Sequence, residues 1–486
     1  MLAFWGVRKH AFRFVIAATC NSTFFGLSCD HLRHVEHMKR IIRFFIIFAV
    51  VVMAAAGVYL GYFSLESTPP VIRIETSPET VGRDFLLAVD VEDSRSGIRT
   101  VAVSLVQGEK TVDLEPEVYQ MIDWWSGTGV HQVSLQWDIR PMELGLSGGE
   151  AMLRVTATDA SLKNGFRGNR RVWEREIIID ITPPVIAVKS LVHNIRIGGA
   201  GLVSYRVSEP VVKTGVWVDD LFFPAYEKKG GGEGFYTSLL ALPYLGGKPE
   251  RIFIEAIDRA GNSVKTGFPH RVLPRARKVD RINISDGFLK RKMPDFMVRY
   301  PEFTGSLKAV FLQINRELRQ KNNEEISGYC KKSVSEILWE GRFLTLPRSA
   351  FMAGFGDERH YFYKGRKIDK AYHMGTDHAS VAHAKVPAAN TGTVVFTGYI
   401  GIYGNSVIID HGQGLFSLYS HLNDIMISSG EHVKKGDIIG LTGMTGLAGG
   451  DHLHFGMLIN GVFVDPREWW DNKWIQDHIL ANIGGE

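Results

Sequence analysis

The pattern of hydrophobic and polar positions begins with one long apolar run near the start of the chain. Residues 44–65 contain no charged side chain, and these 22 residues suffice for a helix to cross a hydrocarbon core of about 30 Å. Basic residues cluster at 39–43 before the run, and Glu66 follows it. The positive-inside rule therefore predicts a transmembrane anchor over residues 44–65, with residues 1–43 in the cytoplasm and the rest of the chain outside.

Two alternatives concern this N-terminal region. A cleavable signal peptide would use residues 44–56 as its apolar part and the three alanines at 54–56 as its cleavage site. The apolar run continues well past those alanines, which favours the anchor. Residues 1–37 lack a clear periodicity and are followed by a second methionine, so we expect Met38 to be the true start.

Downstream of the anchor, the pattern changes to short stretches of alternating apolar and polar residues, and it repeats. The sequence Thr-Pro-Pro-Val-Ile at 68–72 returns at 182–186, which is 114 residues later. Alternating stretches at 153–157 and 252–256 predict β-strands with one buried face. Each of these stretches runs into a cluster of turn-forming residues.

The repeat predicts two tandem β-sandwiches, over residues 68–181 and 182–272, which resemble bacterial immunoglobulin-like domains. We call them the first and second repeat domains. Prolines disfavour central strand pairing at the entry of each domain, and Asp159 and Asp258 open the turns at the exit. These aspartate clusters could bind calcium, but an ordinary turn is the preferred interpretation.

Residues 273–345 follow a different pattern, which predicts a helical connector. A helix is expected to begin at Ser306, and a shorter one at Ser285. The apolar positions of the longer helix recur at helical spacing: Val310, Phe311, Ile314 and Leu318. This stripe most simply packs on a neighbouring domain; covering a groove in the last domain is the less favoured role.

Composition narrows the class of protein. The 486 residues carry 56 Lys and Arg against 52 Asp and Glu, which excludes a strongly basic nucleic-acid binder. With 45% hydrophobic and 22% charged residues, the chain is neither disordered nor a multi-span membrane protein. Cysteine occurs only at Cys20, Cys29 and Cys330, so a disulfide framework is excluded and any metal site must use His, Asp and Glu.

The histidines indicate a polar site in the last part of the chain. Eight of the 17 histidines lie between residues 371 and 454. His452 and His454 precede an apolar run that ends at Asn460-Gly461, the strongest short hairpin signal. The two histidines therefore fall on one strand at spacing i, i+2, and both point to the same face. Two imidazoles on one face are poor core residues, but they suit a shared polar site.

His373 and Asp377 form a second pair, separated by Gly375, which permits a close backbone approach. In an extended chain these two residues also share a face. No H-E-x-x-H helix is present, which excludes a thermolysin-type arrangement. Two His and one Asp leave one position of a tetrahedral zinc open for water. Zinc lowers the pKa of that water to about 7 and so supplies a nucleophile at neutral pH.

Together with their neighbours, these motifs resemble the lysostaphin-type (LytM) zinc metallopeptidase domain, which cleaves peptide cross-links in bacterial peptidoglycan. The resemblance covers residues 346–471 and leaves 472–486 as a C-terminal tail. The motifs occur in order and at compatible spacing: H-x-G-x-D at 373–377, GNSVIIDHG at 404–412, LYSHL at 418–422, VKKGD at 433–437, GLTG at 440–443 and HLHF at 452–455.

The resemblance implies a role for each residue of the site. His373, Asp377 and His454 would be ligands of one zinc ion. His421 and His452 would flank the metal water, one as general base and the other as stabiliser of the tetrahedral oxyanion. Which of the two takes the proton stays open.

Other residues near the motifs receive an ordinary structural interpretation. His378 departs from the usual aliphatic residue, and on an extended chain it faces away from Asp377. The segment 354–359 is a lengthened version of the family's Phe-Gly element and could alter the groove wall. His383, His411 and His432 are expected in surface or turn positions. Aromatic packing is preferred over a substrate groove for four further residues: Tyr403, Trp469, Trp470 and Trp474.

The expected protein is mainly β: an N-terminal transmembrane helix, two Ig-like β-sandwiches, a helical connector and a C-terminal antiparallel β metallopeptidase domain. The expected function is a membrane-anchored zinc endopeptidase that cuts peptidoglycan cross-links. Its site would lie in the periplasm, held to the inner membrane by the anchor. Scarce cysteine and a single anchor suit a Gram-negative periplasm, where the cross-link would be a D-Ala to diaminopimelate bond.

Two alternatives belong to other classes. Family members that have lost zinc ligands activate cell-wall amidases without being enzymes, but all five site positions are intact here. An adhesin that only binds glycan would explain the repeat domains and not the metal constellation. A regulatory protein partner, control by the connector and the oligomeric state stay open.

Overall fold

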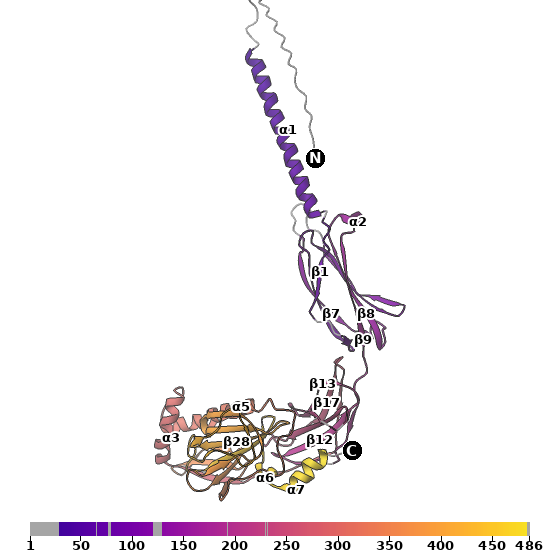
Figure 1. Ribbon diagram of the computed structural model, residues 1–486. Helices are drawn as coiled ribbons and strands as arrows, with labels where there is room; N and C mark the ends of the chain where they lie inside the picture. Colours follow the sequence, from indigo (N-terminus) through magenta and orange to yellow (C-terminus); the bar gives the residue numbers. More distant parts are fainter. Residues whose placement is uncertain are drawn as a thin grey trace, which may run out of the picture. The chain divides into compact units, whose positions relative to one another are not determined.

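The structure is a computed structural model that describes residues 29–64, 66–75, 79–119, 129–191, 193–228, 230 and 232–483. The expected cytoplasmic segment before residue 29, with Cys20, lies outside the described residues. The chain forms two compact units (Figure 1). The first comprises Met1–Thr76, Leu87–Trp137 and Leu153–Arg175, and the second comprises Ser77–Leu86, Asp138–Met152 and Glu176–Glu486. Strand is the main element, as the sequence predicts.

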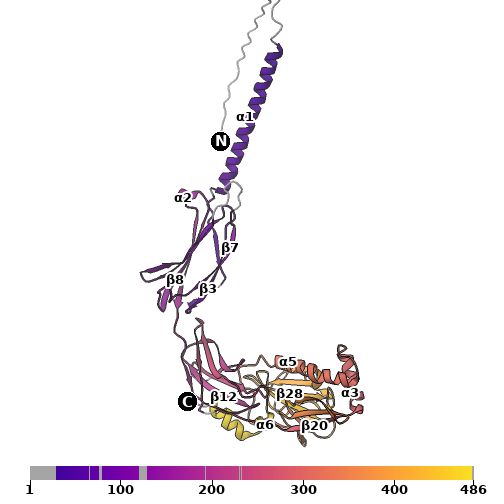
Figure 2. The ribbon, with the colours of Figure 1, turned by 180° about the vertical axis from the view of Figure 1, so that it is seen from behind.

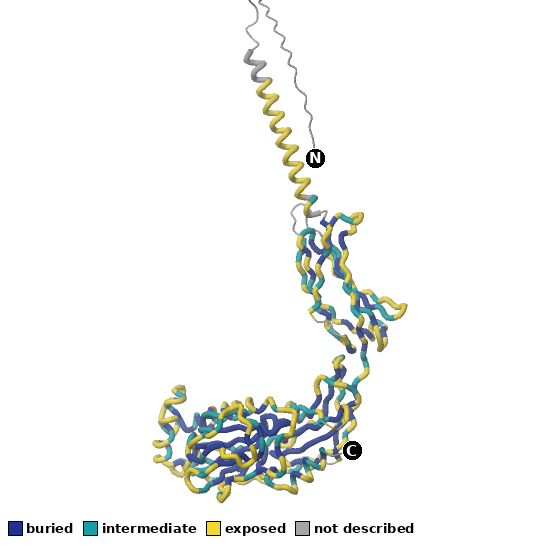
Figure 3. Tube along the Cα trace, viewed as in Figure 1, coloured by how far each residue is buried: buried dark blue, intermediate teal, exposed yellow. Residues whose placement is uncertain are grey.

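The apolar run lies in helix α1 (Cys29–Ser64), which begins well before the expected anchor because the polar residues ahead of the run are helical as well. Within the described part of the chain, α1 is the one helix whose length and composition suit a membrane crossing, over Glu36–Tyr59. Its side chains from residue 36 onward are exposed almost throughout (Figure 3). Pro69 and Pro70, shortly after α1 ends, cannot donate helical hydrogen bonds.

The first repeat domain consists of two sheets. One has the order β1-β3-β7 and the other the order β2-β9-β8-β4-β5. The predicted alternation at 153–157 falls in β8, where Leu153, Val155 and Ala157 are buried. The strands are β1 (Val71–Ile74), β2 (Thr80–Val81), β3 (Phe85–Glu92), β4 (Ile98–Gln107), β5 (Lys110–Asp113), β7 (Gln132–Ile139), β8 (Gly149–Asp159) and β9 (Arg170–Ile179).

The second repeat domain has the same strand connectivity. Its sheets have the orders β10-β12-β16-β15 and β14-β13-β17-β18. Strands β10, β12 and β17 therefore correspond to β1, β3 and β8 of the first repeat domain. The strands are β10 (Ile186–Val188), β12 (Ala200–Val207), β13 (Val211–Val218), β14 (Leu221–Pro224), β15 (Tyr226–Glu227), β16 (Phe235–Ala241), β17 (Ile252–Asp258) and β18 (Ser263–Thr266).

The connector contains the expected helices and also a strand. Helix α3 (Asp286–Arg299) begins after Ser285, whose Oγ accepts a hydrogen bond from Phe288 N, and α4 (Leu307–Gln313) begins in the same way after Ser306. The helix continues through η1 (Ile314–Leu318) into α5 (Arg319–Tyr329). Ahead of α3, strand β20 (Val279–Ile284) pairs in parallel with β22 (Glu358–Tyr363), and the sequence did not predict this strand.

The apolar stripe of the connector packs on the C-terminal domain, which was the favoured role, and Phe311 of this stripe also lines a cavity of that domain, which was the less favoured one. Val310, Phe311, Ile314 and Leu318 are all buried in one core with residues of the C-terminal sheet such as Phe416. The connector is therefore a structural part of the C-terminal domain and not a spacer ahead of it.

The C-terminal domain is built on an antiparallel sheet of order β21-β24-β32-β28-β27-β26-β30, with β33 paired to β32. Asn460 and Gly461 form the predicted two-residue hairpin, both with positive φ, as a type I′ turn requires. The strands are β21 (Ala350–Ala353), β24 (Thr376–Ala379), β26 (Gly392–Ile400), β27 (Gly404–Asp410), β28 (Leu415–Leu422), β30 (His432–Val433), β32 (Leu453–Ile459) and β33 (Val462–Val464).

The second repeat domain and the C-terminal domain share one hydrophobic core, which includes Tyr205 and Leu239 of the former and Tyr419 and Trp469 of the latter. The expected C-terminal tail takes part: α7 (Asn472–Ile475) leads into η3 (Gln476–Leu480) and α8 (Ala481–Ile483), and the last two lie beside β12 (Figure 2). Ile475 and Ile479 are fully buried there, so the described part of this segment is an ordered element of the core.

Candidate active site

Three side chains meet where β24 and β32 run side by side. The antiparallel register places Asp377 opposite His454, and His373 lies just after β23 (Arg366–Tyr372). His373 Nε2 lies 2.9 Å from Asp377 Oδ1 and 3.0 Å from His454 Nδ1, and His454 Nδ1 lies 3.0 Å from the same oxygen. All three residues are buried. The structure thus brings together the three residues that the sequence proposed as metal ligands.

Gly375 makes this meeting possible. A Cβ atom at position 375 would lie 2.6 Å from His454 Nε2 and 2.6 Å from the carbonyl oxygen of Phe455. Only glycine therefore allows the segment between His373 and Asp377 to approach β32 so closely.

Hydrogen bonds fix the tautomer of His373. Its Nδ1 lies 2.9 Å from the carbonyl oxygen of Gly354, which can only accept, so Nδ1 carries the proton. In the neutral ring, Nε2 is then an acceptor, and it faces the acceptor Oδ1 of Asp377 at 2.9 Å. With the ring neutral, a metal ion between these two acceptors would satisfy both of them.

The electrostatics keep the group in a metal-binding state. Burial lowers the pKa of His373 and lowers that of His454 to about 4, so both imidazoles are neutral at pH 7. Burial acts to raise the pKa of Asp377, but His373, His454 and Arg359 together lower it well below its usual range. Two neutral imidazoles and one carboxylate are the donors that zinc prefers, and the residues present therefore fit a zinc ion.

Arg359 on β22 is a part of the site that the sequence analysis missed. Its Nη2 donates to Asp377 Oδ2 at 2.6 Å, while Oδ1 of the same carboxylate faces the two imidazoles. Arg359 lies in the segment 354–359, which the sequence interpreted only as a groove wall. Its position depends on the pairing of β22 with β20 and β23, and no local motif signals that pairing.

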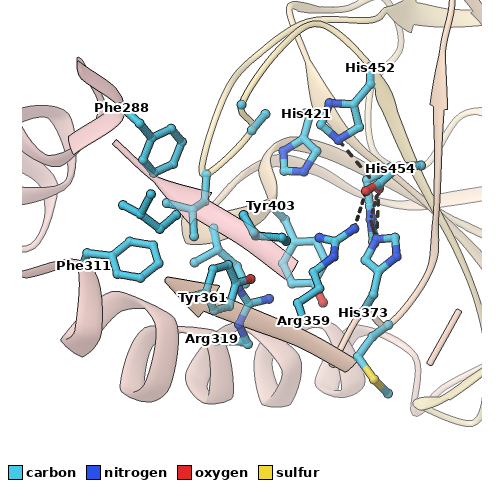
Figure 4. A pocket seen from close by; sticks show the side chains of 18 of the residues that line it. Phe288, Phe311, Arg319, Arg359, Tyr361, His373, Tyr403, His421, His452 and His454 are labelled. Atoms are coloured by element: carbon cyan, nitrogen blue, oxygen red, sulfur yellow. Dashed lines mark hydrogen bonds and ion pairs between the residues drawn. The ribbon is translucent and has the colours of Figure 1, made fainter. Parts of the chain in front are cut away.

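His421 and His452 lie next to the three ligand candidates, as the sequence proposed. Their ring centroids are 4.8 Å apart, and the ring of His421 lies 5.8 Å from that of His454 (Figure 4). His452 Nε2 lies 3.6 Å from Asp377 Oδ1.

Both rings have the same tautomer. His421 Nδ1 donates to the carbonyl oxygen of Thr445 at 2.9 Å, and His452 Nδ1 donates to that of Gly450 at 2.8 Å. The neutral rings therefore present an unprotonated Nε2. Burial, reinforced by His452 and His454, lowers the pKa of His421 well below its ordinary value, so this ring is neutral at pH 7.

These residues line one cavity of about 340 Å³, shared by the C-terminal domain and the connector (Figure 4). Apolar side chains from β20, α3 and α4 form its far wall, including Ile284, Phe288 and Phe311, and Arg319 at the start of α5 adds a positive charge. The connector thus supplies part of the cavity in addition to packing on the sheet.

The other histidines between residues 371 and 454 lie outside the group of metal-ligand candidates and their two flanking histidines. His378 on β24 packs against the rings of Phe351 and Trp470, and its nitrogens lie near hydroxyl groups of Ser349 and Thr376. His383 and His432 are exposed. His411, expected at the surface or in a turn, is instead fully buried, because Thr391 O and Ser417 Oγ satisfy both ring nitrogens.

The aromatic residues divide between cavity and core. Tyr403 lines the cavity, and its hydroxyl donates to Asn323 Oδ1 at 2.8 Å. Trp469 is fully buried, Trp474 packs against it, and Trp470 packs on Phe455. For the three tryptophans, aromatic packing is the observed role.

The fold and the site together define an antiparallel β domain with a buried His, His and Asp group of the metal-binding kind. Residues 371–466 match the sequence model of Peptidase family M23. The C-terminal domain of this chain is therefore a domain of peptidase family M23, the lysostaphin type that the motifs indicate.

Curated relatives and solved structures each resemble a part of the chain. DD-carboxypeptidase/endopeptidase Mpg of Neisseria meningitidis serogroup B is 40% identical over 94 residues, which are 19% of this chain and 22% of the relative. Peptidoglycan DD-endopeptidase ShyC of Vibrio cholerae is 38% identical over 95 residues, 20% of this chain and 22% of the relative. The catalytic domain of lysostaphin from Staphylococcus simulans is 28% identical, with 27% of this chain and 98% of that chain covered and a TM-score of 0.24. The chain spans about a fifth of the length of the curated relatives it matches.

Proposed function

We propose that this protein is a membrane-anchored zinc metalloendopeptidase that hydrolyses peptide cross-links of peptidoglycan. The observation that carries the proposal is the group His373, Asp377 and His454, flanked by His421 and His452 in one cavity. Relatives with the same domain are named as peptidoglycan endopeptidases, which supports the substrate class. The apolar helix α1 supports an anchor.

In this proposal, His373, Asp377 and His454 hold one zinc ion. Zinc, when bound by such a group, acts as a Lewis acid and makes water a nucleophile at neutral pH. Arg359 holds Oδ2 of Asp377, which leaves Oδ1 directed at the two imidazoles. Arg359 is therefore a positioning residue in our proposal.

His421 and His452 supply the acid–base chemistry of the hydrolysis. Each has its Nδ1 proton engaged by a carbonyl oxygen, so each presents Nε2 as a proton acceptor. One ring takes the proton of the attacking water on Nε2 and gives it to the leaving amine nitrogen as the C–N bond breaks. The other ring, after it has taken a proton from solvent on Nε2, donates a hydrogen bond to the developing oxyanion. The two rings have equivalent hydrogen bonding, and the assignment between them stays open.

The substrate and the compartment belong to the same proposal. An anchor in the inner membrane would hold the site in the periplasm, where a D-Ala to diaminopimelate cross-link is the expected bond. The cavity carries apolar residues from the connector beside Arg319 and Arg359, which suits a peptide that also presents a carboxylate.

The test compares the full chain in detergent, loaded with zinc, with its Asp377→Ala, His421→Ala and His452→Ala variants on purified sacculi. Released muropeptides are resolved by mass spectrometry, and zinc is measured on the same samples. We expect loss of cross-linked dimers with the parent and with the control variant His432→Ala, which changes an exposed histidine of the same domain. Asp377→Ala should lose both zinc and cleavage. His421→Ala and His452→Ala should keep zinc while cleavage falls about 100-fold or more.

A zinc-loaded parent that leaves the dimers intact would contradict the proposal. Stimulation of a cell-wall amidase by that same sample would instead support the alternative function, a non-enzymatic protein that activates cell-wall amidases.

A further inference from the structure

Three buried acidic side chains meet at the entry of the first repeat domain. Glu66 lies between helix α1 and β1, Asp93 directly follows β3, and Asp159 is the last residue of β8. One carboxylate oxygen from each of the three lies within 4.8 Å of the other two. Their exposed fractions are 3%, 4% and 0%.

One oxygen of this group lacks a hydrogen bond although it is buried. Glu66 Oε1 accepts hydrogen bonds from Ser96 N and Ser96 Oγ at 2.8 and 2.6 Å, but Oε2 has no hydrogen-bond partner. Its one positively charged neighbour in the described chain is Arg95, whose Nε lies 3.9 Å from Oε2 and whose side chain is 36% exposed. A carboxylate oxygen buried without a hydrogen bond is costly, and a single arginine does not balance three carboxylates.

The second repeat domain has an equivalent group. Asp180, Glu209 and Asp258 hold the corresponding positions: before the first strand, after β12 and at the end of β17. Asp180 lies two residues before the repeated Thr-Pro-Pro sequence, as Glu66 does. Both copies of the repeat therefore carry three acidic residues at the same place in the fold.

An asparagine completes each group in the same way. Asn169 Nδ2 donates to the carbonyl oxygen of Glu66 at 3.0 Å and to Asp159 Oδ2 at 2.7 Å. Asn262 Nδ2 donates to the carbonyl oxygen of Asp180 at 2.8 Å and to Asp258 Oδ2 at 3.0 Å. The asparagine orients the aspartate and ties it to the segment that enters the domain.

The negative charge at this place is unbalanced. Three carboxylates gathered in a buried space repel one another. A bound cation would relieve this repulsion and also supply the missing partner of Glu66 Oε2.

We propose that the first repeat domain binds one calcium ion through Glu66, Asp93 and Asp159; the group in the second repeat domain is more exposed, because Asp180 and Glu209 are only half-buried. Calcium fits because every ligand is an oxygen, and calcium accepts several carboxylates in irregular geometry. Magnesium demands a stricter octahedral site, and zinc prefers nitrogen or sulfur ligands. The inference does not depend on the proposed peptidase function.

Binding at the first site would connect three parts of the chain that are far apart in sequence. The segment that leaves α1 would be fixed to the ends of β3 and β8 by one ion. Calcium would thereby stabilise the entry of the domain in addition to the hydrogen bonds from Asn169.

The test measures calcium on the full chain in detergent by equilibrium dialysis against radioactive calcium at millimolar free concentration. We expect calcium to bind to the parent, and we expect Glu66→Gln and Asp159→Asn each to bind one ion fewer than the parent. Glu109→Gln, which changes an exposed glutamate in the turn between β4 and β5, should bind as many ions as the parent. An equal concentration of magnesium should not displace the calcium.

Several outcomes would overturn the proposal. These are a parent that binds no calcium, or a number of bound ions that is unchanged in Glu66→Gln. The parent measurement stands on its own if a variant fails to fold. Circular dichroism on each variant identifies such a failure, and thermal unfolding of the parent with and without calcium provides the second readout, a higher midpoint with calcium.

Discussion

At the scale of single residues, the two oxygens of Asp377 have different partners. Oδ1 faces His373 and His454, whereas Oδ2 accepts a hydrogen bond from Arg359. A side chain that holds a ligand in position commonly changes metal affinity or activity by about 10–100-fold when it is removed. Arg359 therefore contributes to zinc binding in our proposal without being a ligand.

We predict that Arg359→Gln weakens zinc binding and lowers cleavage by about 10–100-fold, because Oδ2 loses its charged partner and Asp377 its fixed orientation. Zinc affinity is measured by competition with a chromophoric chelator. Arg366→Gln, an exposed arginine on the neighbouring strand, is the matched control and should match the parent. Equal zinc affinity of the two variants would contradict the positioning role.

His411 gives a pH prediction of its own. Burial lowers its pKa to about 4, against an ordinary value of about 6.5. Below pH 6.5 the ring takes up a proton in the unfolded state but stays neutral in the folded state. The folded state is therefore not penalised above pH 6.5, and it loses stability as the pH falls from 6.5 towards 4. We expect this residue alone to account for about 2 kcal/mol of lost stability between pH 7 and pH 5.

The measurement is urea unfolding of the full chain at both pH values, compared with a His411→Asn variant. The variant should be less stable at pH 7, and its stability should fall less steeply between the two values. A difference between variant and parent that does not change with pH would contradict the prediction.

At the scale of elements, the approach of the segment 373–377 to β32 depends on one glycine. We predict that Gly375→Ala lowers cleavage about 100-fold and reduces zinc binding, because the new methyl group would push His454 and the backbone of Phe455 away. Gly267→Ala is the control, since a Cβ there meets no atom within 4 Å. Unchanged zinc content in Gly375→Ala would show that the sheet can adjust.

Many of the elements could be predicted from the sequence, because the signals that specify them are local. The type I′ hairpin at Asn460-Gly461, the helix caps at Ser285 and Ser306 and the alternation in β8 all depend on neighbouring residues. The motifs around His373 and His454 predicted that their side chains meet, and in the structure they do.

Other features depend on contacts between distant segments, and the sequence did not predict them. Strand β20 exists through its pairing with β22, about 80 residues away, and this pairing helps to position Arg359. His411 is buried because Ser417 and Thr391 satisfy its ring. A single sequence contains no periodicity from which such partners can be inferred.

At the scale of the whole molecule, a buried ion pair joins the segment after the second repeat domain to the C-terminal domain. Arg275 Nη1 donates to Asp465 Oδ2 at 2.7 Å, and both side chains are less than a tenth exposed. Asp465 also accepts a hydrogen bond from Arg467, so Asp465 keeps one charged partner when Arg275 is removed. The cost of removing one member of a buried pair is therefore partly compensated here.

We predict that Arg275→Gln lowers the stability of the second unit by about 2–4 kcal/mol. Arg251→Gln, which removes an exposed pair with Asp220, should change it by less than about 1 kcal/mol. Urea unfolding followed by tryptophan fluorescence measures both variants. Equal stability of the two would show that the junction does not depend on this ion pair.

The common core of the second repeat domain and the C-terminal domain distinguishes the two copies of the repeat. The second copy shares its interior with the peptidase domain, and Thr237 and Gln413 form a buried hydrogen bond across that junction. The second copy is thus tied to the peptidase domain through a common interior, in which no described residue of the first copy takes part. Trimming the second copy would expose the interior of the peptidase domain itself.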